Sequence, residues 1–263
     1  MNDGGEQEIH SRRGIYLLPN LFTTGALFAG FYAIVAAMDG RFEAAAVAVF
    51  IAIVLDGLDG RIARMTQTTS AFGAEYDSLS DMVSFGLAPS LVMYEWALVH
   101  LKSMGWIWAK LGWLAAFFYA AAAALRLARF NTLVGSTDKR YFIGLPSPTA
   151  AAVLMGMVWT WHDLGVSGAV LRVPALILTV LVGGLMVSRV RYYSFKDLDL
   201  RNRVPFVAVL VIVLVFMFAA IDPPKVLFGG FLLYTLVGPF ISWRRRRPAS
   251  SRGEAGKPPP DDL

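Results

Sequence analysis

The second hydrophobic stretch of the chain joins an unbroken apolar run to a pair of acidic residues. Residues 42–65 read FEAAAVAVFIAIVLDGLDGRIARM, so the chain is apolar up to Leu55 and then reaches Asp56 and Asp59. A bilayer-spanning helix needs about 20 mostly apolar residues. An aspartate near the centre of a bilayer costs about 2.5–3.5 kcal/mol on insertion scales. The stretch therefore predicts a membrane helix that ends in a functional acidic pair.

The composition of the whole chain also indicates a membrane protein. Of 263 residues, 56% are hydrophobic and 16% are charged, whereas soluble domains average about 25% charged residues. The mean hydropathy is +0.55. No ordinary soluble core hides this much apolar surface. The absence of cysteine from the sequence excludes a disulfide scaffold and a thiolate zinc site. We therefore predict an all-α, polytopic membrane helical bundle.

Apolar stretches elsewhere in the chain bring the expected number of transmembrane helices to about eight. Several connections are short and polar, as turns are, for example Asp39-Gly40 and Asp222-Pro223-Pro224. The predicted spans are 18–37, 42 to beyond 55, 83–101 (after a polar start near 75), 106–125, 148–161, 170–187, 204–221 and 226–243.

The distribution of basic residues predicts how the bundle is oriented. With the N-terminus inside, 19 of the 24 Lys and Arg residues fall in inner segments, as the positive-inside rule requires. This placement explains the net charge of +5 without nucleic acid. We expect an integral protein of the bacterial inner (cytoplasmic) membrane with both termini cytoplasmic. We expect residues 1–14 to form a cytoplasmic N-terminal tail, 15–243 the membrane catalytic domain, and 244–263 a basic, disordered cytoplasmic tail.

A second acidic pair follows the first, on the next expected helix. Asp77 and Asp81 are four residues apart, and Asp56 and Asp59 are three apart, so each pair shares one helix face. A hairpin with its turn at 66–70 would bring the four carboxylates together at the cytoplasmic edge. Such a cluster attracts Mg²⁺ or Mn²⁺. Two such ions stabilise the attacking and the leaving oxygen when one group displaces another at phosphorus. An isolated pair is usually solvated or caps a helix, but four aspartates beside apolar spans indicate a site.

Small residues separate these aspartates and leave room for a ligand. Gly60, Ala63 and Gly73 add little bulk to the acidic face, so a diphosphate could approach the backbone there. Arg64 could bind a phosphate with two hydrogen bonds. The spacing thus predicts metal-assisted phosphoryl-type transfer at a membrane surface.

The same residues resemble the signature of the CDP-alcohol phosphatidyltransferase family, D-x2-D-G-x2-A-R-x8-G-x3-D-x3-D. Every fixed position is filled, from Asp56 to Asp81. The resemblance implies a six-helix membrane core, a homodimer and a site on the cytoplasmic side. It implies that the four aspartates hold two divalent cations, Mg²⁺ or Mn²⁺, against the diphosphate of a CDP-linked lipid. Asp81 would act as general base, and Gly60, Ala63, Arg64 and Gly73 would line the CDP site.

Further stretches resemble the phosphatidylserine synthase branch of that family, which adds two helices to the core. They are residues 18–24, 85–89, 126–131, 144–148 and 191–196. The resemblance implies transfer of the phosphatidyl group from CDP-diacylglycerol to serine, with release of CMP.

Polar residues near the inner ends of the predicted helices are candidates for substrate binding. Arg126 and Arg129, three residues apart, could hold the carboxylate of serine, although an ordinary inner-leaflet boundary also explains them. Asn131 and Ser147 offer neutral contacts to serine. The remaining candidates are Asn20 and Thr23, which either bind the CDP-lipid or cap the first helix.

Two alternatives to this function remain. The acceptor could be glycerol phosphate, inositol or choline. A divalent-cation transporter would use the acidic cluster as an ion site, but it should carry polar residues through both membrane halves. Here the acidic residues gather on the inner side, which favours the enzyme.

Overall fold

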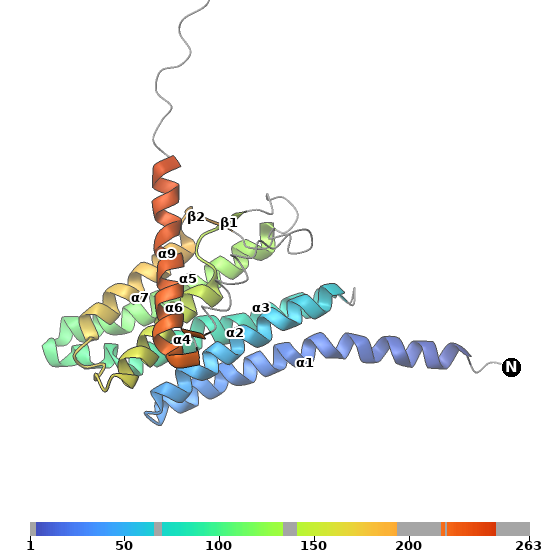
Figure 1. Ribbon diagram of the computed structural model, residues 1–263, viewed down its shortest axis with the longest axis horizontal. Coiled ribbons are helices and arrows are strands. Elements are labelled where there is room, and N and C mark those ends of the chain that lie inside the picture. The colour runs from blue at the N-terminus through green and yellow to red at the C-terminus, as the bar shows by residue number, and fades with distance from the viewer. Residues whose placement is uncertain (1–3, 66–69, 134–140, 194–216, 219, 246–263) are drawn as a thin grey trace, which may run out of the picture.

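The computed structural model is a bundle of helices with one small sheet (Figure 1). It describes residues 4–65, 70–133, 141–193, 217–218 and 220–245. The elements are the α-helices α1 (Gly4–Met38), α2 (Phe42–Met65), α3 (Ala71–Asp81), α4 (Ala88–Trp96), α5 (Trp106–Leu133), α6 (Ser147–Asp163), α7 (Arg172–Val187) and α9 (Pro223–Arg245), the π-helix η1 (Met82–Leu87), the 3₁₀-helix η2 (Leu98–Met104), and the strands β1 (Tyr141–Ile143) and β2 (Arg191–Tyr193).

These helices coincide with seven of the eight predicted spans, and most of the remaining one, 204–221, lies outside the described residues. Three helical stretches are long and apolar enough to cross a membrane: Asn20–Met38, Ala71–Met104 and Trp106–Thr132. A helical bundle with three candidate membrane spans is thus confirmed, whereas the total of eight spans and the orientation of the termini stay predictions. The helix α1 begins at Gly4, inside the segment predicted as an N-terminal tail.

The first helices pack closely because small residues line their contact. Ala33, Ala36, Ala45, Ala46 and Ala52 are completely buried, and α1 and α2 lie side by side along most of α2 (Figure 1). Without a hydrophobic driving force in lipid, helices associate through close packing of small residues. This contact fixes the position of the end of α2, where Asp56 and Asp59 lie.

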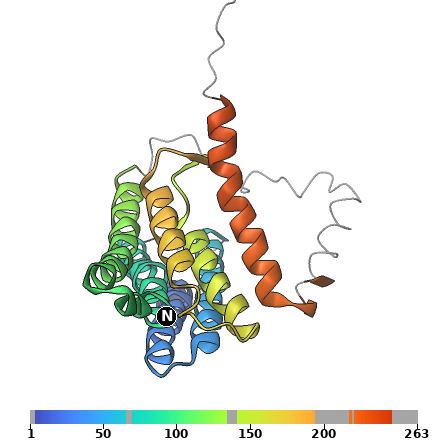
Figure 2. The ribbon, with the colours of Figure 1, turned by 90° about the vertical axis from the view of Figure 1, so that its left-hand side faces the viewer.

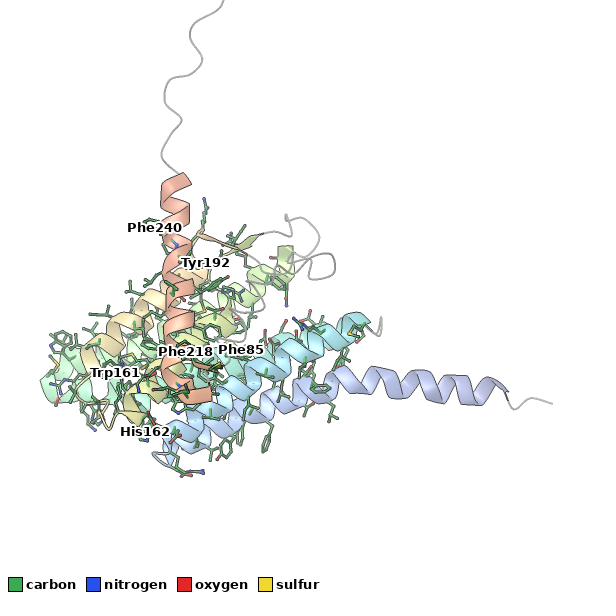
Figure 3. All side chains as sticks on the ribbon, viewed as in Figure 1. Phe85, Trp161, His162, Tyr192, Phe218 and Phe240 are labelled. Carbon is green, nitrogen blue, oxygen red and sulfur yellow. The ribbon has the colours of Figure 1, made fainter. Side chains whose placement is uncertain are left out.

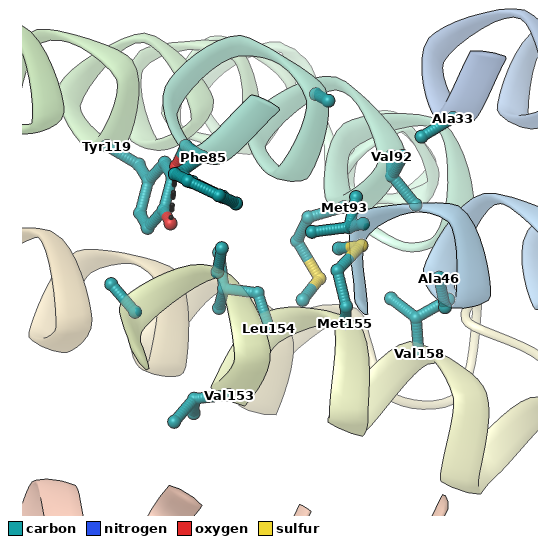
Figure 4. Packing of buried hydrophobic residues seen from close by; sticks show 14 of the residues in the cluster. Ala33, Ala46, Phe85, Val92, Met93, Tyr119, Val153, Leu154, Met155 and Val158 are labelled. Atoms are coloured by element: carbon teal, nitrogen blue, oxygen red, sulfur yellow. Dashed lines mark hydrogen bonds between the residues drawn. The ribbon is translucent and has the colours of Figure 1, made fainter. Parts of the chain in front are cut away.

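The core of the bundle lies between η1, α4, α5 and α6. Phe85, Met93, Tyr119, Leu154 and Met155 are fully buried there (Figure 4). Figure 3 shows Phe85 in the middle of the bundle. The third predicted span is therefore not one regular helix, since the π-helix η1 separates α3 from α4.

A two-stranded antiparallel sheet was not predicted and corrects the expectation of a purely helical fold. Tyr141 pairs with Tyr193 and Ile143 with Arg191. Strands of three residues are too short for an alternating pattern, so the sequence carries no signal for them. The sheet fastens α9, which lies along the side of the bundle in Figure 2, because the buried Tyr192 hydroxyl donates to the Thr235 carbonyl at 3.2 Å.

Gly144 ends β1 in a conformation that favours glycine. Its φ is +84°, and an added Cβ would collide with the Met186 carbonyl oxygen. We expect Gly144→Ala to lower the free energy of unfolding by at least about 1–2 kcal/mol, because the left-handed backbone strain adds to the collision. Thermal unfolding in detergent measures the loss.

Gly165 provides the control, since its φ is +69° but an added Cβ would meet no atom within 4 Å. Gly165→Ala should lose stability through backbone strain alone. A loss as large as that of Gly144→Ala would contradict the close packing of the β1–α6 connection against the end of α7.

Candidate active site

Three of the four aspartates meet at the ends of two adjacent helices. Carboxylate oxygens of Asp56 and Asp59 on α2 and of Asp77 on α3 all lie within 4.8 Å of one another. The spacing of three residues places the α2 pair on one face, and α3, which packs against α1, brings Asp77 to that face. This acidic triad confirms that the two sequence pairs converge, and its oxygen ligands suit a hard divalent cation.

Asp81 lies beside the triad, one turn after Asp77. Its carboxyl group is within hydrogen-bonding reach of the Asp56 carboxylate. Four carboxylates this close repel one another unless a proton or a cation lies between them. The residues present thus fit the divalent cations that the sequence predicted, and Asp81 adds a fourth carboxyl group next to the triad.

Thr23 on α1 connects the two acidic helices. Its hydroxyl donates to Asp59 Oδ2 at 2.7 Å, and its carbonyl accepts the hydroxyl of Ser80 at 3.1 Å. Thr23 is buried, so the structure shows it orienting Asp59 and the residue before Asp81. The capping role considered for Asn20 and Thr23 is wrong, because α1 starts at Gly4 and both residues lie inside it.

The other residues predicted for the CDP-lipid flank the triad. An added Cβ on the exposed Gly60 would meet no atom within 4 Å, which leaves open space beside Asp59. At the start of α3, a Cβ on Gly73 would lie 3.6 Å from Asn20 Oδ1. Ala63 and Arg64 belong to α2, but their side chains lie outside the described part.

Of the residues predicted to bind serine, Arg126 and Ser147 come together. Arg126 Nη1 donates to the buried Ser147 Oγ at 2.8 Å. Its buried Nε has no hydrogen-bond partner among the described residues, and its charge interacts with Asp81 and Tyr234. A partly buried guanidinium beside the acidic cluster provides a place for an anionic group.

The other two predicted acceptor residues lie further along α5. Asn131 Nδ2 donates to Ser78 Oγ at 2.9 Å, which ties the end of α5 to α3 next to Asp77. Arg129 is half-buried, and its carbonyl accepts the Thr132 hydroxyl. The structure thus divides the predicted set, with Asn131 joined to α3 and only Ser147 joined to Arg126.

Sequence reasoning missed two tyrosines at this site. Tyr76 on α3 shares a hydrogen bond of 2.9 Å with Thr24 on α1. Tyr234 on α9 packs against the Tyr192 ring, with centroids 5.6 Å apart, and lies in the electrostatic range of Arg126. Each of these contacts joins helices or strands that are far apart in the sequence, so no local pattern could reveal them.

Comparison with known proteins gives a consistent assignment. The family model described as CDP-alcohol phosphatidyltransferase matches residues 16–183. A CDP-diacylglycerol–serine O-phosphatidyltransferase of Helicobacter pylori (strain 26695) is 35% identical over 223 residues, covering 85% of this chain and 91% of the relative. The enzyme of that name from Mycobacterium tuberculosis (strain H37Rv) is 38% identical over 154 residues, covering 56% of this chain and 51% of the relative.

An archaetidylserine synthase of Methanothermobacter thermautotrophicus is 32% identical over 177 residues, covering 66% of this chain and 69% of the relative. The matched family segment contains the triad, Asp81, Arg126 and Ser147. The aspartate spacing, the convergence of the aspartates in space and the match over most of the chain agree, and the chain belongs to the CDP-alcohol phosphatidyltransferase family.

Proposed function

We propose that this chain transfers the phosphatidyl group of CDP-diacylglycerol to the hydroxyl of serine, giving phosphatidylserine and CMP. The observation that carries the reaction type is the convergence of Asp56, Asp59 and Asp77, with Asp81 beside them. The choice of serine rests on the names of the relatives, which span bacterial and archaeal organisms. Glycerol phosphate, inositol and choline are the acceptors that the test must separate from serine.

We propose that the three triad carboxylates, with Asp81, hold two divalent cations, Mg²⁺ or Mn²⁺. Bound there, the cations would neutralise the diphosphate and stabilise the departing CMP. Thr23 keeps Asp59 oriented through its hydrogen bond, and the open space at Gly60 leaves room for the CDP-lipid to approach. In the proposed site, Asn20, Ala63, Arg64 and Gly73 complete the surface that faces the CDP-lipid.

Asp81 serves as the general base in this proposal. It accepts the proton of the serine hydroxyl, whose oxygen forms a bond to the lipid-side phosphorus. The bond from that phosphorus to the oxygen of CMP breaks, and CMP leaves with that oxygen. The displacement is direct, because the sequence has no cysteine and none of the described serines or histidines forms a nucleophile–base–acid triad.

Arg126 and Ser147 bind the acceptor next to Asp81. The guanidinium pairs with the serine carboxylate, and its unused Nε provides the second donor of a two-point contact. Arg129 and Asn131 extend this polar surface toward the end of α5. The charge of Arg126 also offsets part of the negative charge of Asp81, with which it interacts.

The proposed site faces the cytoplasm of the bacterial inner membrane. The apolar helices support an integral membrane protein, and the positive-inside rule supports the orientation, because 19 of the 24 Lys and Arg residues fall in segments that the sequence predicts to be inner. The CDP-lipid would enter sideways from the inner leaflet with its acyl chains between helices. We further propose that the protein works as a homodimer.

Release of CMP from CDP-diacylglycerol with serine tests the reaction directly. We expect Asp81→Asn to lower turnover at least about 100-fold, as the loss of a general base does, and chelation of divalent cations to abolish it. Circular dichroism and gel filtration should show that Asp81→Asn retains the fold.

Thin-layer analysis with each labelled alcohol identifies the acceptor in the same assay. Faster product formation with glycerol phosphate, inositol or choline than with serine would refute serine as the acceptor alcohol. Cation flux into proteoliposomes without CMP release would refute the transferase function and favour a divalent-cation transporter.

The acceptor contact predicts a selective kinetic effect. Arg126→Lys removes the two-point geometry and should raise KM for serine about tenfold, equivalent to about 1.4 kcal/mol, while KM for CDP-diacylglycerol stays within about twofold. Arg41→Lys, at an exposed ion pair with Asp39, is the matched control and should change neither value. An equal rise in both KM values for Arg126→Lys would argue against a serine-specific contact.

A further inference from the structure

The chain that follows Asp81 forms an irregular π-turn, and Pro89 gives a reason for it in the sequence. In an α-helix the carbonyl of Phe85 would accept the N–H of residue 89, but residue 89 is proline and has none. The chain forms the π-helix Met82–Leu87 instead, and the N–H of Ala88 donates five residues back to Val83. The Phe85 carbonyl therefore loses its ordinary α-helical donor in the middle of the bundle.

Tyr119 on α5 supplies a donor to this carbonyl. Its hydroxyl lies 3.0 Å from the Phe85 oxygen, and both side chains are completely buried (Figure 4). A second contact holds η1 from the other side, since Ser84 Oγ donates to the Ala26 carbonyl on α1 at 2.9 Å. Two buried hydroxyls thus hold the π-turn, one in a bond to α5 and the other in a bond to α1.

The contact between α5 and η1 is also sterically tight. A Cβ on Gly86 would lie 3.2 Å from Ala123 Cβ. Tyr119, Ala123 and Arg126 are spaced four and three residues apart, so they share the face of α5 that meets η1. The face of α5 that contacts the π-turn is therefore also the face from which Arg126 extends to the vicinity of Asp81.

The π-turn determines the direction in which Asp81 points. Phe85 follows Asp81 by four residues, about one turn. A π-turn contains one residue more than regular α-helix, so its loss would rotate α3 relative to α4 by about 100°. Such a rotation would turn Asp81 away from Asp56 and from the acceptor side.

We propose that Tyr119 is a positioning residue for the transfer reaction, whose hydroxyl holds the π-turn between Asp81 and α4 so that the Asp81 carboxyl faces Asp56 and the acceptor. The proposal rests on the role of Asp81 in the proposed function. In this proposal Tyr119 acts through the backbone of η1, to which its hydroxyl donates, although it also lies in the electrostatic range of Arg126.

The test compares Tyr119→Phe with Tyr192→Phe in the full-length protein. Both changes remove a buried tyrosine hydroxyl that donates to a backbone carbonyl, Phe85 in one case and Thr235 in the other. We expect Tyr119→Phe to lower kcat for CMP release about tenfold with KM for CDP-diacylglycerol within about twofold, because misplacement of a reacting group chiefly affects turnover. Tyr192→Phe should lose similar thermal stability and keep kcat within about twofold.

An unchanged kcat in Tyr119→Phe, or an equal fall in both variants, would overturn the positioning role. Ser84→Ala removes the other hydroxyl on the same turn and should reproduce the kcat-selective loss; it decides the question alone if Tyr119→Phe does not yield folded protein. Full turnover in Asp81→Asn would overturn the proposed base itself. Loss of turnover in Asp81→Asn with normal kcat in Tyr119→Phe and Ser84→Ala would overturn the positioning role alone.

Discussion

Mutual repulsion among closely placed carboxylates is the constraint around which this bundle is organised. Asp56, Asp59 and Asp77 bring their oxygens within 4.8 Å of one another beside apolar helices, where negative charge is costly to hold without a counter-ion. Nearby contacts oppose the tendency of the helices to separate. The clearest is Thr23, which binds Asp59 through its hydroxyl and Ser80 through its carbonyl. A cation bound at the triad would convert this repulsion into attraction.

The close approach of α1 to α2 is what allows one threonine to act in this way. Alanines such as Ala33 and Ala45 are completely buried in that contact, and larger side chains would move the backbones apart. The short reach of Thr23 would then miss Asp59. The small residues of the bundle thus contribute to the geometry of the site although none of them carries chemistry.

The sequence predicts those parts of the site that depend on helical spacing. Asp56 and Asp59 share a face, and Asp77 meets them because the hairpin is short. Arg126 and Ser147, both predicted for the acceptor side, also lie in contact. Pro89 gives a local reason for the π-turn, but the hydrogen bond from Tyr119 to the Phe85 carbonyl could not be predicted, because it comes from another helix. The same reason applies to the β1–β2 pair and to Tyr234, since contacts between distant segments leave no periodic pattern.

In the proposed reaction both reactants bring negative charge to one site, the diphosphate of the CDP-lipid and the carboxylate of serine. The proposal therefore needs acidic ligands for cations and a basic side chain at short range. The aspartates on α2 and α3 would hold the cations, and Arg126 on α5 would pair with the carboxylate. Arg126 reaches the site from the helix that also holds the π-turn below Asp81. Asp81 and Arg126, the proposed base and the proposed acceptor contact, therefore both depend on α5, and a shift of α5 would move both together.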